Sequence, residues 1–88
     1  MFFYVYIIQS SVSSKFYTGY TQNLTKRIEE HNNGENISTK HGIPWRLIYF
    51  EGCLNKEDAL RRENYLKTSQ GSRLIKSRIK EFLYSRHS

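Results

Sequence analysis

At residues 2–8 the chain reads FFYVYII, an unbroken run of apolar, aromatic and β-branched side chains. Such a run lacks the alternation of a half-exposed strand and is typical of a strand that is covered on both faces. We therefore predict that this strand lies in the middle of a sheet. The polar residues 10–15 predict a turn, and residues 16–21 predict the returning strand of a hairpin.

The remaining predicted elements are a helix, a loop, a strand and two helices, at residues 23–33, 35–44, 46–51, 55–67 and 72–84. Gly34 follows the first helix, where glycine commonly ends helices, and Asn55 suits an N-cap. Gly71 is expected to break the chain between the last two helices. The predicted fold is therefore α/β (α+β), with a three-stranded antiparallel sheet, a central first strand and three helices in the order β-β-α-β-α-α.

Length and composition limit the class of protein. The 88 residues make one domain, residues 1–88, with room for one modest core. The lone Cys53 excludes an internal disulfide and a Cys-rich zinc site, and it fits a reducing compartment. No stretch approaches the roughly 20 apolar residues of a membrane span, and the start lacks the features of a signal peptide. We expect a cytoplasmic protein.

The net charge of +6 is unevenly distributed. Residues 1–59 carry six basic and six acidic side chains, whereas residues 60–88 carry eight basic and two acidic ones. The whole excess therefore lies in the last third of the chain. A one-sided basic surface is typical of a nucleic-acid-binding protein. A solvated helix face that only aids solubility is the alternative, and charge alone does not separate the two.

The hairpin brings tyrosines together. With a turn at residues 10–13, Tyr6 is expected opposite Tyr17 and Tyr4 opposite Gly19, so that Tyr6 and Tyr17 point to the same face of the sheet. Gly19 would leave space beside them for a backbone or a ligand. Tyrosine pairs are also common packing units, so this pair by itself favours a structural role.

Arg27, His31 and Glu63 stand where apolar side chains are expected. Leu24 and Ile28 mark the buried face of the first helix, and at about 100° per residue Arg27 and His31 fall within about 60° of Leu24. Glu63 falls on the apolar face of the second helix. A buried carboxylate costs several kcal/mol unless it is paired or binds a metal. An Arg27–Glu63 ion pair is the structural alternative, but it explains neither His31 nor the tyrosines.

In order along the chain, these residues resemble the motifs of the GIY-YIG nuclease family. The matching segments are Tyr4-Val5-Tyr6, Tyr17-Thr18-Gly19, the helix positions Leu24, Arg27 and His31, and the helix of Arg62-Glu63 and Leu66-Lys67. The resemblance covers nearly the whole chain and is closest to small standalone bacterial members, which are related to homing endonucleases and to the nuclease subunit of excision repair. The chain departs at Tyr4, where the family has glycine, and at Tyr20, where some members carry lysine.

This resemblance implies a metal-dependent endonuclease that hydrolyses DNA, structure-selective rather than sequence-selective, in repair or recombination. The implied catalytic residues are Tyr6, Tyr17, Arg27, His31 and Glu63. Glu63 would hold Mg²⁺ or Mn²⁺, since one carboxylate with waters is a usual magnesium site, and Arg27 would clamp phosphate oxygens. Tyr6 or Tyr17 would accept a proton from water as a phenolate favoured by Arg27 and the divalent ion, and His31 would orient a phenol or relay a proton.

Basic residues late in the chain are the predicted nucleic-acid contacts, namely Lys67, Arg73, Lys76 and Lys80. The expected partner is DNA, including branched or single-stranded DNA, bound by a monomer or a weak homodimer. His41 and His87 are expected to be exposed, whereas Thr39, Lys40 and Trp45 are expected to border the cleft, with Trp45 also suited to the core. The alternative function is a non-catalytic nucleic-acid-binding or partner-docking domain that keeps the nuclease scaffold.

Overall fold

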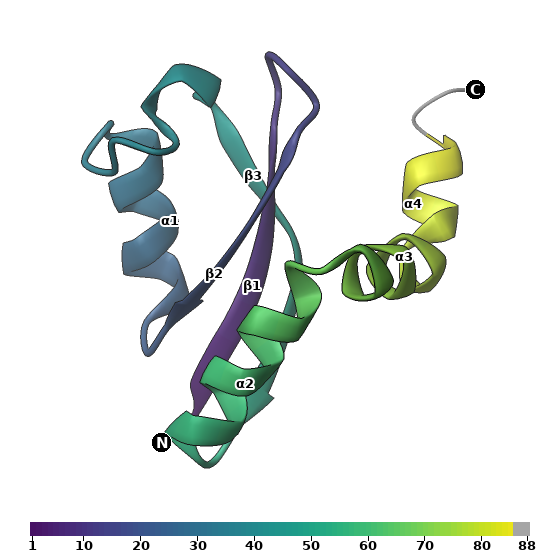
Figure 1. The fold of residues 1–88 in the computed structure, drawn as a ribbon. Helices are drawn as coiled ribbons and strands as arrows, with labels where there is room; N and C mark the ends of the chain where they lie inside the picture. Colours follow the sequence, from purple (N-terminus) through teal and green to yellow (C-terminus); the bar gives the residue numbers. More distant parts are fainter. Residues whose placement is uncertain (86–88) are drawn as a thin grey trace.

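The computed structural model describes residues 1–85, so the predicted exposure of His87 lies outside the described residues. Three antiparallel strands form a sheet in the order β2-β1-β3 (Figure 1). β1 spans Phe3–Ser10, β2 spans Phe16–Thr21 and β3 spans Trp45–Cys53. The last six residues of β1 are all buried, as a strand with neighbours on both sides and helices on both faces must be. The predicted central position of the first strand is confirmed.

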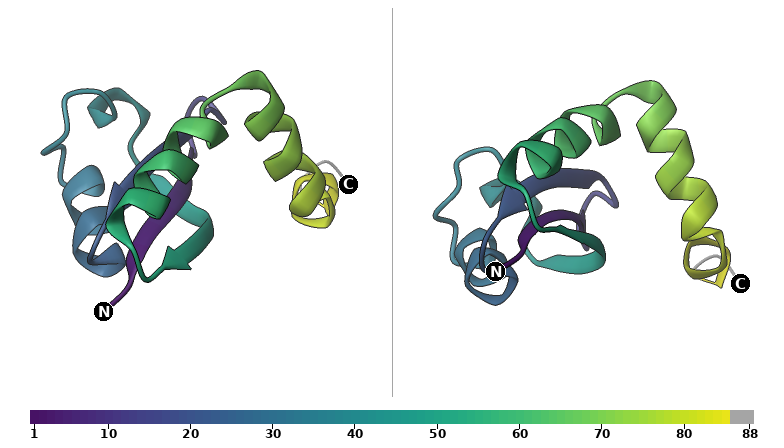
Figure 2. Two further views of the ribbon diagram at one scale, coloured as in Figure 1. Left: turned by 60° about the horizontal axis from the view of Figure 1, so that its bottom comes forward. Right: turned by 90° about the horizontal axis from the view of Figure 1, so that it is seen from below.

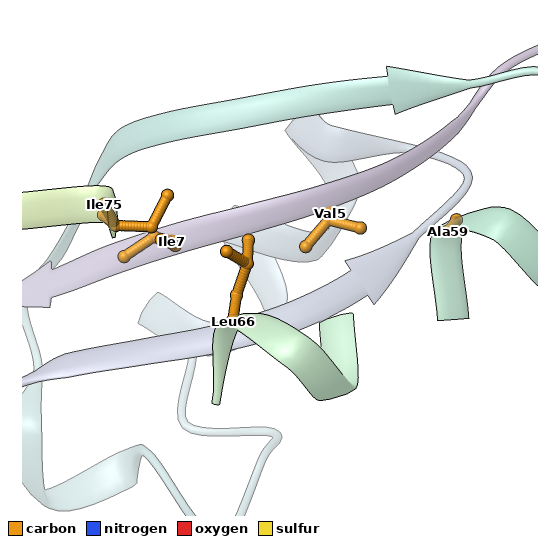
Figure 3. Close-up of a cluster of buried hydrophobic side chains, with 5 residues drawn as sticks. All are labelled: Val5, Ile7, Ala59, Leu66 and Ile75. Atoms are coloured by element: carbon orange, nitrogen blue, oxygen red, sulfur yellow. The ribbon is translucent and has the colours of Figure 1, made fainter. Parts of the chain in front are cut away.

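One face of the sheet packs against the second half of the chain. Val5 and Ile7 of β1 contact residues of α2 (Lys56–Leu66) and α3 (Ser69–Arg78), and the buried cluster is Val5, Ile7, Ala59, Leu66 and Ile75 (Figure 3). These β1 side chains alternate with those of Tyr6 and Ile8, which point to the opposite face.

The other face packs against α1, which spans Leu24–Asn32. Tyr6, Ile8 and Trp45 form a second buried cluster there, and partly buried side chains of α1 close it. The sheet therefore separates two small cores, with α1 on one side and α2 on the other (Figure 2). A polar site built on Tyr6 belongs to the α1 core.

The predicted helix boundaries near α1 and α2 are confirmed by their caps. The side chain of Asn23 accepts a hydrogen bond from the Lys26 backbone N–H, and the side chain of Asn55 accepts one from that of Glu57. Each amide oxygen satisfies a donor that has no partner inside the helix. Gly34 follows α1 with a φ of +77°, a conformation that side chains disfavour and glycine adopts freely.

The prediction for the last helix is wrong in two respects. The chain forms two helices there, α3 (Ser69–Arg78) and α4 (Lys80–Ser85), because Ile79 leaves the helical conformation between them. α4 follows at the end of α3 (Figure 2), and the guanidinium of Arg46 on β3 lies 4.8 Å from the centre of its Phe82 ring. Gly71 also does not break a helix: it is buried in the first turn of α3, and its backbone N–H donates to the side chain of Thr68.

Close packing of α2 against α3 explains Gly71. A Cβ at this position would lie 2.1 Å from the backbone oxygen of Tyr65, which is too close for any side chain. The close approach of α2 and α3 therefore requires a glycine here. Gly71 lies within α3, whereas the sequence placed it between two helices.

The segment between α1 and β3 is ordered by the core beneath it. It contains a short 3-10 turn at Lys40–Gly42. The indole N–H of Trp45 donates to the backbone oxygen of Thr39 at 2.7 Å. The hydroxyl of Ser10 donates to the backbone oxygen of Gly42 at 2.6 Å. Trp45 is buried, in agreement with its predicted suitability for the core. This segment is what brings Thr39 to the face of the sheet that carries Tyr6.

Candidate active site

The hairpin register differs from the prediction by two residues. Tyr6 pairs with Gly19, and Tyr17 pairs with Ile8. The turn lies further along the chain than expected: the backbone N–H of Ser10 donates to Lys15 at 3.0 Å, and Ser14 has a φ of +64°. The Ser10 hydroxyl also accepts from the backbone N–H groups of Val12 and Ser13, which stabilises this turn. Because the error is an even number of residues, Tyr6 and Tyr17 still share a face.

Gly19 makes room for Tyr6 itself. A Cβ on Gly19 would lie 2.3 Å from the Tyr6 hydroxyl oxygen and 2.4 Å from the ring carbon that carries it. The phenol of Tyr6 therefore lies across the backbone of β2 at this point. The space that we predicted for a ligand or a backbone is filled by this side chain.

The Tyr6 hydroxyl is the centre of a polar group. It lies 2.8 Å from Nε2 of His31, and it accepts a hydrogen bond from Nε of Arg27 at 3.2 Å. Tyr6 and His31 are both fully buried. The ring of Tyr17 lies edge-on to that of His31, with 5.2 Å between the ring centroids. The structure thus brings Tyr6, Tyr17, Arg27 and His31 together.

The network continues from His31 to Thr39. Nδ1 of His31 lies 2.8 Å from the Thr39 hydroxyl, which donates in turn to the backbone oxygen of Asn36 at 3.4 Å. If the Thr39 proton is used in this way, Nδ1 must donate to Thr39, so Nε2 must accept from Tyr6. Every proton then points in one direction, from Arg27 to Asn36. Sequence reasoning placed Thr39 only at the border of the cleft; its distance from His31 in the chain gave no sign of this contact.

Burial dominates the proton affinities of this cluster. Removal from water raises the pKa of the Tyr6 phenol, and the hydrogen bond and charge of Arg27 oppose that rise without cancelling it. Arg27 therefore favours the phenolate of Tyr6, as expected, but burial of the phenol has the larger effect on its pKa. Burial, and then the charge of Arg27, lower the pKa of His31. His31 is neutral at physiological pH, as an acceptor of the Tyr6 proton must be.

Arg27 and Glu63 each have an ionic partner on their own helix. Nη1 of Arg27 lies 3.0 Å from the Glu30 carboxylate, and the carboxylate of Glu63 lies 3.0 Å from Nζ of Lys67. The predicted alternative of a structural Arg27–Glu63 ion pair is therefore wrong. Glu63 faces the interior more than the solvent, with 16% of its side chain exposed. Its charge contributes, weakly, to the raised pKa of Tyr6, so both charged groups act on the same phenol.

The protein donors at this site suit a hard cation that keeps most of its water. The described residues contain no group of three or more His, Cys, Asp or Glu side chains able to hold a metal ion. Glu63 offers a single carboxylate. Mg²⁺ is commonly bound through one or two carboxylates, with waters and substrate phosphates as its other ligands, whereas Zn²⁺ needs several protein ligands. The donor set therefore fits Mg²⁺ or Mn²⁺ and does not fit zinc.

Three of the four predicted nucleic-acid contacts lie together. Lys67, Arg73 and Lys76 line one hollow of about 540 Å³ at the start of α3. Lys80 is exposed on α4 and is not among the residues that line this hollow. Of the other residues considered, His41 and Lys40 are exposed. The described part of the chain has no helix long and apolar enough to cross a membrane.

A three-stranded sheet that carries a buried Tyr–His–Arg cluster, with a glutamate on the helix across it, is the arrangement of a GIY-YIG nuclease domain. The chain belongs to this family: the GIY-YIG catalytic domain matches residues 2–82. Its relatives include UPF0213 proteins of bacteria.

Two relatives and one solved structure illustrate this similarity. The chain is 44% identical to a UPF0213 protein of Clostridium perfringens, over 94% of each chain. It is 39% identical to one of Staphylococcus saprophyticus, over 83% of this chain and 89% of the relative. Its fold is similar to the solution NMR structure of a UPF0213 protein from Bacillus halodurans, with a TM-score of 0.54 and 31% identity over 88% of this chain and 84% of that one.

Proposed function

We propose that the protein is a metal-dependent endonuclease that hydrolyses DNA phosphodiester bonds, selects DNA by structure and acts in repair or recombination. The observation that supports this proposal most directly is the hydrogen-bonded chain that runs from the partly exposed Arg27 to the buried Tyr6, His31 and Thr39. A buried set of charged and titratable groups is expensive to maintain as packing alone, and such groups concentrate at reaction sites. Membership of the GIY-YIG family supports the same chemistry.

Tyr17 is the proposed acceptor of the water proton. Tyr6 is fully buried, and its hydroxyl is already bonded to Arg27 and His31, so attacking water cannot reach it. Tyr17 is half-buried and lines a hollow together with Lys67. A phenol is a poor base at neutral pH unless nearby cations stabilise its phenolate. In this assignment His31 orients Tyr17 through ring contact, and Tyr6 positions both His31 and Arg27.

Arg27 is the proposed clamp for the reacting phosphate. Tyr6 and Glu30 hold two of its nitrogens, and about a third of its side chain remains exposed. It lines a hollow of about 490 Å³ beside Lys26 and Lys56. A guanidinium that is fixed on one side and open on the other is suited to bind non-bridging phosphate oxygens without reorganisation.

Glu63 is the proposed protein ligand of the metal. Mg²⁺ or Mn²⁺, when bound, supplies a Lewis acid for the phosphate and the leaving oxygen. Lys67 would then leave Glu63 and pair with phosphate, so the ion pair holds the carboxylate in place before substrate arrives. One carboxylate argues against a two-metal reaction.

A non-catalytic DNA-binding domain is the second candidate. It is favoured by the same Glu63–Lys67 pair, since Lys67 satisfies the carboxylate without any metal. In that case the basic surface would bind DNA, as a monomer or a weak homodimer, and the tyrosine cluster would be structural.

A nuclease assay separates the two candidates. Duplex, nicked, branched and single-stranded DNA are incubated with the protein in Mg²⁺, Mn²⁺ or EDTA. We expect metal-dependent cleavage of at least one structure, abolished by Glu63→Ala and retained by Glu57→Ala, which removes an exposed carboxylate from the same helix. Binding without cleavage of any substrate by the wild-type protein would contradict the nuclease and support the binding domain.

A further inference from the structure

A second groove lies beyond the candidate active site. It has a volume of about 730 Å³ and separates the end of the β1–β2 hairpin from α3 and α4. Gln9, Lys15 and Phe16 line one wall, and Ser72, Lys76 and Leu83 line the other. Apart from Lys76, none of these residues has a role in the proposed chemistry. The ribbon shows α3 and α4 extending away from the sheet on this side (Figure 1).

The charge of the groove is entirely positive. Lys15 and Lys76 contribute one cation from each wall, and none of the described residues that line the groove is acidic. The neighbouring hollow of about 540 Å³ adds Lys67 and Arg73, also without an acidic lining residue among those described, and the two hollows share Ser72. Four cations along two adjoining hollows attract a polyanion.

Gln9 adds to the wall of the groove a hydrogen-bond acceptor that a phosphate diester cannot use. Its side chain is almost fully buried, with 6% of the residue exposed. Its Nε2 donates to the backbone oxygen of Ser14 at 3.2 Å, which orients the amide, and its Oε1 has no hydrogen-bond partner among the described residues. A buried carbonyl oxygen requires a donor. Phosphate diesters have none, whereas the base of a nucleotide carries amino or imino N–H groups.

Phe16 supplies a surface for a base. It pairs with Gln9 across the hairpin, so both side chains point to the same face of the sheet, and its ring is only partly buried. Bases stack on aromatic rings in most proteins that bind single strands, and any base can do so. In a duplex, the faces of each base are covered by the neighbouring base pairs, so a base inside a duplex cannot stack on Phe16. An unpaired nucleotide meets all three requirements: stacking, a donor for Gln9 and phosphates for the lysines.

We infer that this groove binds an unpaired nucleotide of a nucleic-acid strand, with its base on Phe16 and against Oε1 of Gln9, and its phosphates at Lys15 and Lys76. A third hollow, of about 340 Å³, connects the two sites, because it is lined by Phe16 and Ser72 as well as by Tyr17 and Lys67. The substrate class is therefore a strand with an unpaired segment beside the cut. Only the statement that the unpaired segment lies beside the cut rests on the proposed function.

Binding is measured by fluorescence anisotropy in EDTA, so that cleavage plays no part. The probes are a twelve-nucleotide single-stranded DNA, an abasic strand of the same length, the corresponding RNA and a twelve-residue polyglutamate. We expect the base-containing strands to bind more tightly than the abasic strand. Phe16→Leu and Gln9→Met should each reduce this preference by about tenfold, the effect of losing one base contact, with little change for the abasic strand. DNA and RNA are distinguished by their relative affinities.

Lys15→Gln should weaken both strands equally and lower the slope of log K against log salt by about 0.7. Arg61→Gln, an equal charge change on the exposed face of α2, should have no effect. Because Phe16 also packs against the core, each variant is checked by thermal unfolding, and NMR of the wild-type protein provides an independent reading. The side-chain amide of Gln9 and the backbone amides of Ser72 and Leu83 should shift with the DNA strand.

Equal binding of abasic and base-containing strands, equal binding of polyglutamate, or NMR shifts that miss the groove would each overturn the inference. Its failure is distinguishable from that of the proposed function. A protein that binds the base-containing strand through Phe16 and cleaves nothing retains the groove and loses the nuclease. A protein that cleaves DNA while Phe16→Leu and Gln9→Met keep the wild-type base preference retains the nuclease and loses the groove.

Discussion

Tyr6 and Tyr17 share a face of the sheet but differ in what surrounds their hydroxyl groups. Tyr6 is sealed in the core, where it is bonded to His31 and Arg27. Tyr17 is half-buried at the edge strand β2. The difference follows from the hairpin register, since Gly19 gives the ring of Tyr6 a place to lie. It assigns a positioning role to Tyr6 and leaves Tyr17 as the phenol that meets water.

Two single substitutions test this assignment. Tyr6→Phe leaves the buried Nε2 of His31 without a donor, so unfolding free energy should fall by about 1–3 kcal/mol. Tyr17→Phe should cost less than about 1 kcal/mol, yet it should lower the cleavage rate by at least about a hundredfold, as expected when a general base is lost. Urea unfolding and single-turnover cleavage provide the two measurements. Full activity in Tyr17→Phe would rule it out as the base.

Glu63→Gln separates a metal ligand from a structural carboxylate. The change keeps size and hydrogen-bonding capacity but removes the charge that a hard cation requires. Cleavage should fall by orders of magnitude, while DNA affinity in metal-free buffer holds or rises. Because Glu63 pairs with a half-exposed Lys67 and not with Arg27, unfolding free energy should change by less than about 1 kcal/mol. A matched Glu57→Gln control should leave all three quantities unchanged.

The lowered pKa of His31 predicts a specific dependence of stability on pH. The unfolded chain protonates this histidine near its ordinary pKa of about 6.5, whereas the folded protein resists protonation down to lower pH. The unfolded state therefore binds more protons below about pH 6.5, and stability should decrease as pH falls from 7 towards 5.5. Thermal midpoints measured across this range should flatten in His31→Gln. The exposed His41→Gln should retain the wild-type slope.

At the scale of elements, the contact between α2 and α3 depends on Gly71. This contact holds the basic start of α3 beside Glu63 and Lys67 on α2, and so it relates the candidate active site to the surface proposed for DNA. Thr68 caps α3 by accepting from the backbone N–H of Gly71, so the turn and the helix contact use the same residue. Substitution of Gly71 should weaken both the cap of α3 and the contact between α2 and α3.

Gly71→Ala is predicted to destabilise the protein. Alanine favours a helix over glycine by about 1 kcal/mol, but the new Cβ would meet backbone of α2, which cannot rotate away. The steric cost should exceed the helix preference, with a net loss of about 2 kcal/mol in unfolding free energy. Urea unfolding measures it, with Ser77→Ala on the exposed side of α3 as the control. An unchanged or increased stability would show that α2 and α3 can separate at little cost.

At the scale of the whole molecule, the chemistry and the net charge occupy different parts. The tyrosine cluster lies on the α1 face of the sheet, whereas the positive excess comes from the last third of the chain, whose described part forms the helices after β3. The ion pairs Arg27–Glu30 on α1 and Glu63–Lys67 at α2 neutralise charges near the cluster. A polyanion is therefore drawn to α3, from which it reaches the site through the hollow beside Tyr17 and Lys67.

This separation predicts that the charges govern affinity and not the chemical step. Changing Arg73, Lys76 and Lys80 together to Gln removes three candidate phosphate contacts. The slope of log K against log salt for duplex DNA should then flatten by up to about 2.7, while single-turnover cleavage at saturating protein stays near the wild-type rate. A double Lys40→Gln, Arg61→Gln variant, away from α3 and α4, should leave the slope unchanged. An unchanged slope for the triple variant as well would show that the excess positive charge serves only solubility.

Local chemistry was sufficient to predict the strands and the first two helices, but not the division of the last predicted helix into α3 and α4. The apolar run at residues 2–8 specifies a strand covered on both faces, whatever lies above and below it, and Asn23, Asn55 and Gly34 mark helix ends through their own backbone preferences. The polar residues on the buried face of α1 could also be recognised, because helical periodicity is a property of the segment alone. These features require no knowledge of distant contacts.

The partners of those residues were decided only by tertiary structure. The hairpin turn lies later in the chain than predicted because the Ser10 hydroxyl accepts hydrogen bonds from the turn backbone. The resulting register pairs Tyr6 with Gly19. Glu30, a neighbour on the same helix, pairs with Arg27, whereas the structural alternative drawn from the sequence assigned that place to Glu63. Thr39 reached His31 because the loop before β3 is held by Trp45. Each outcome depends on which groups meet across the fold at a distance of a few ångströms, and a pattern along the chain does not contain that distance.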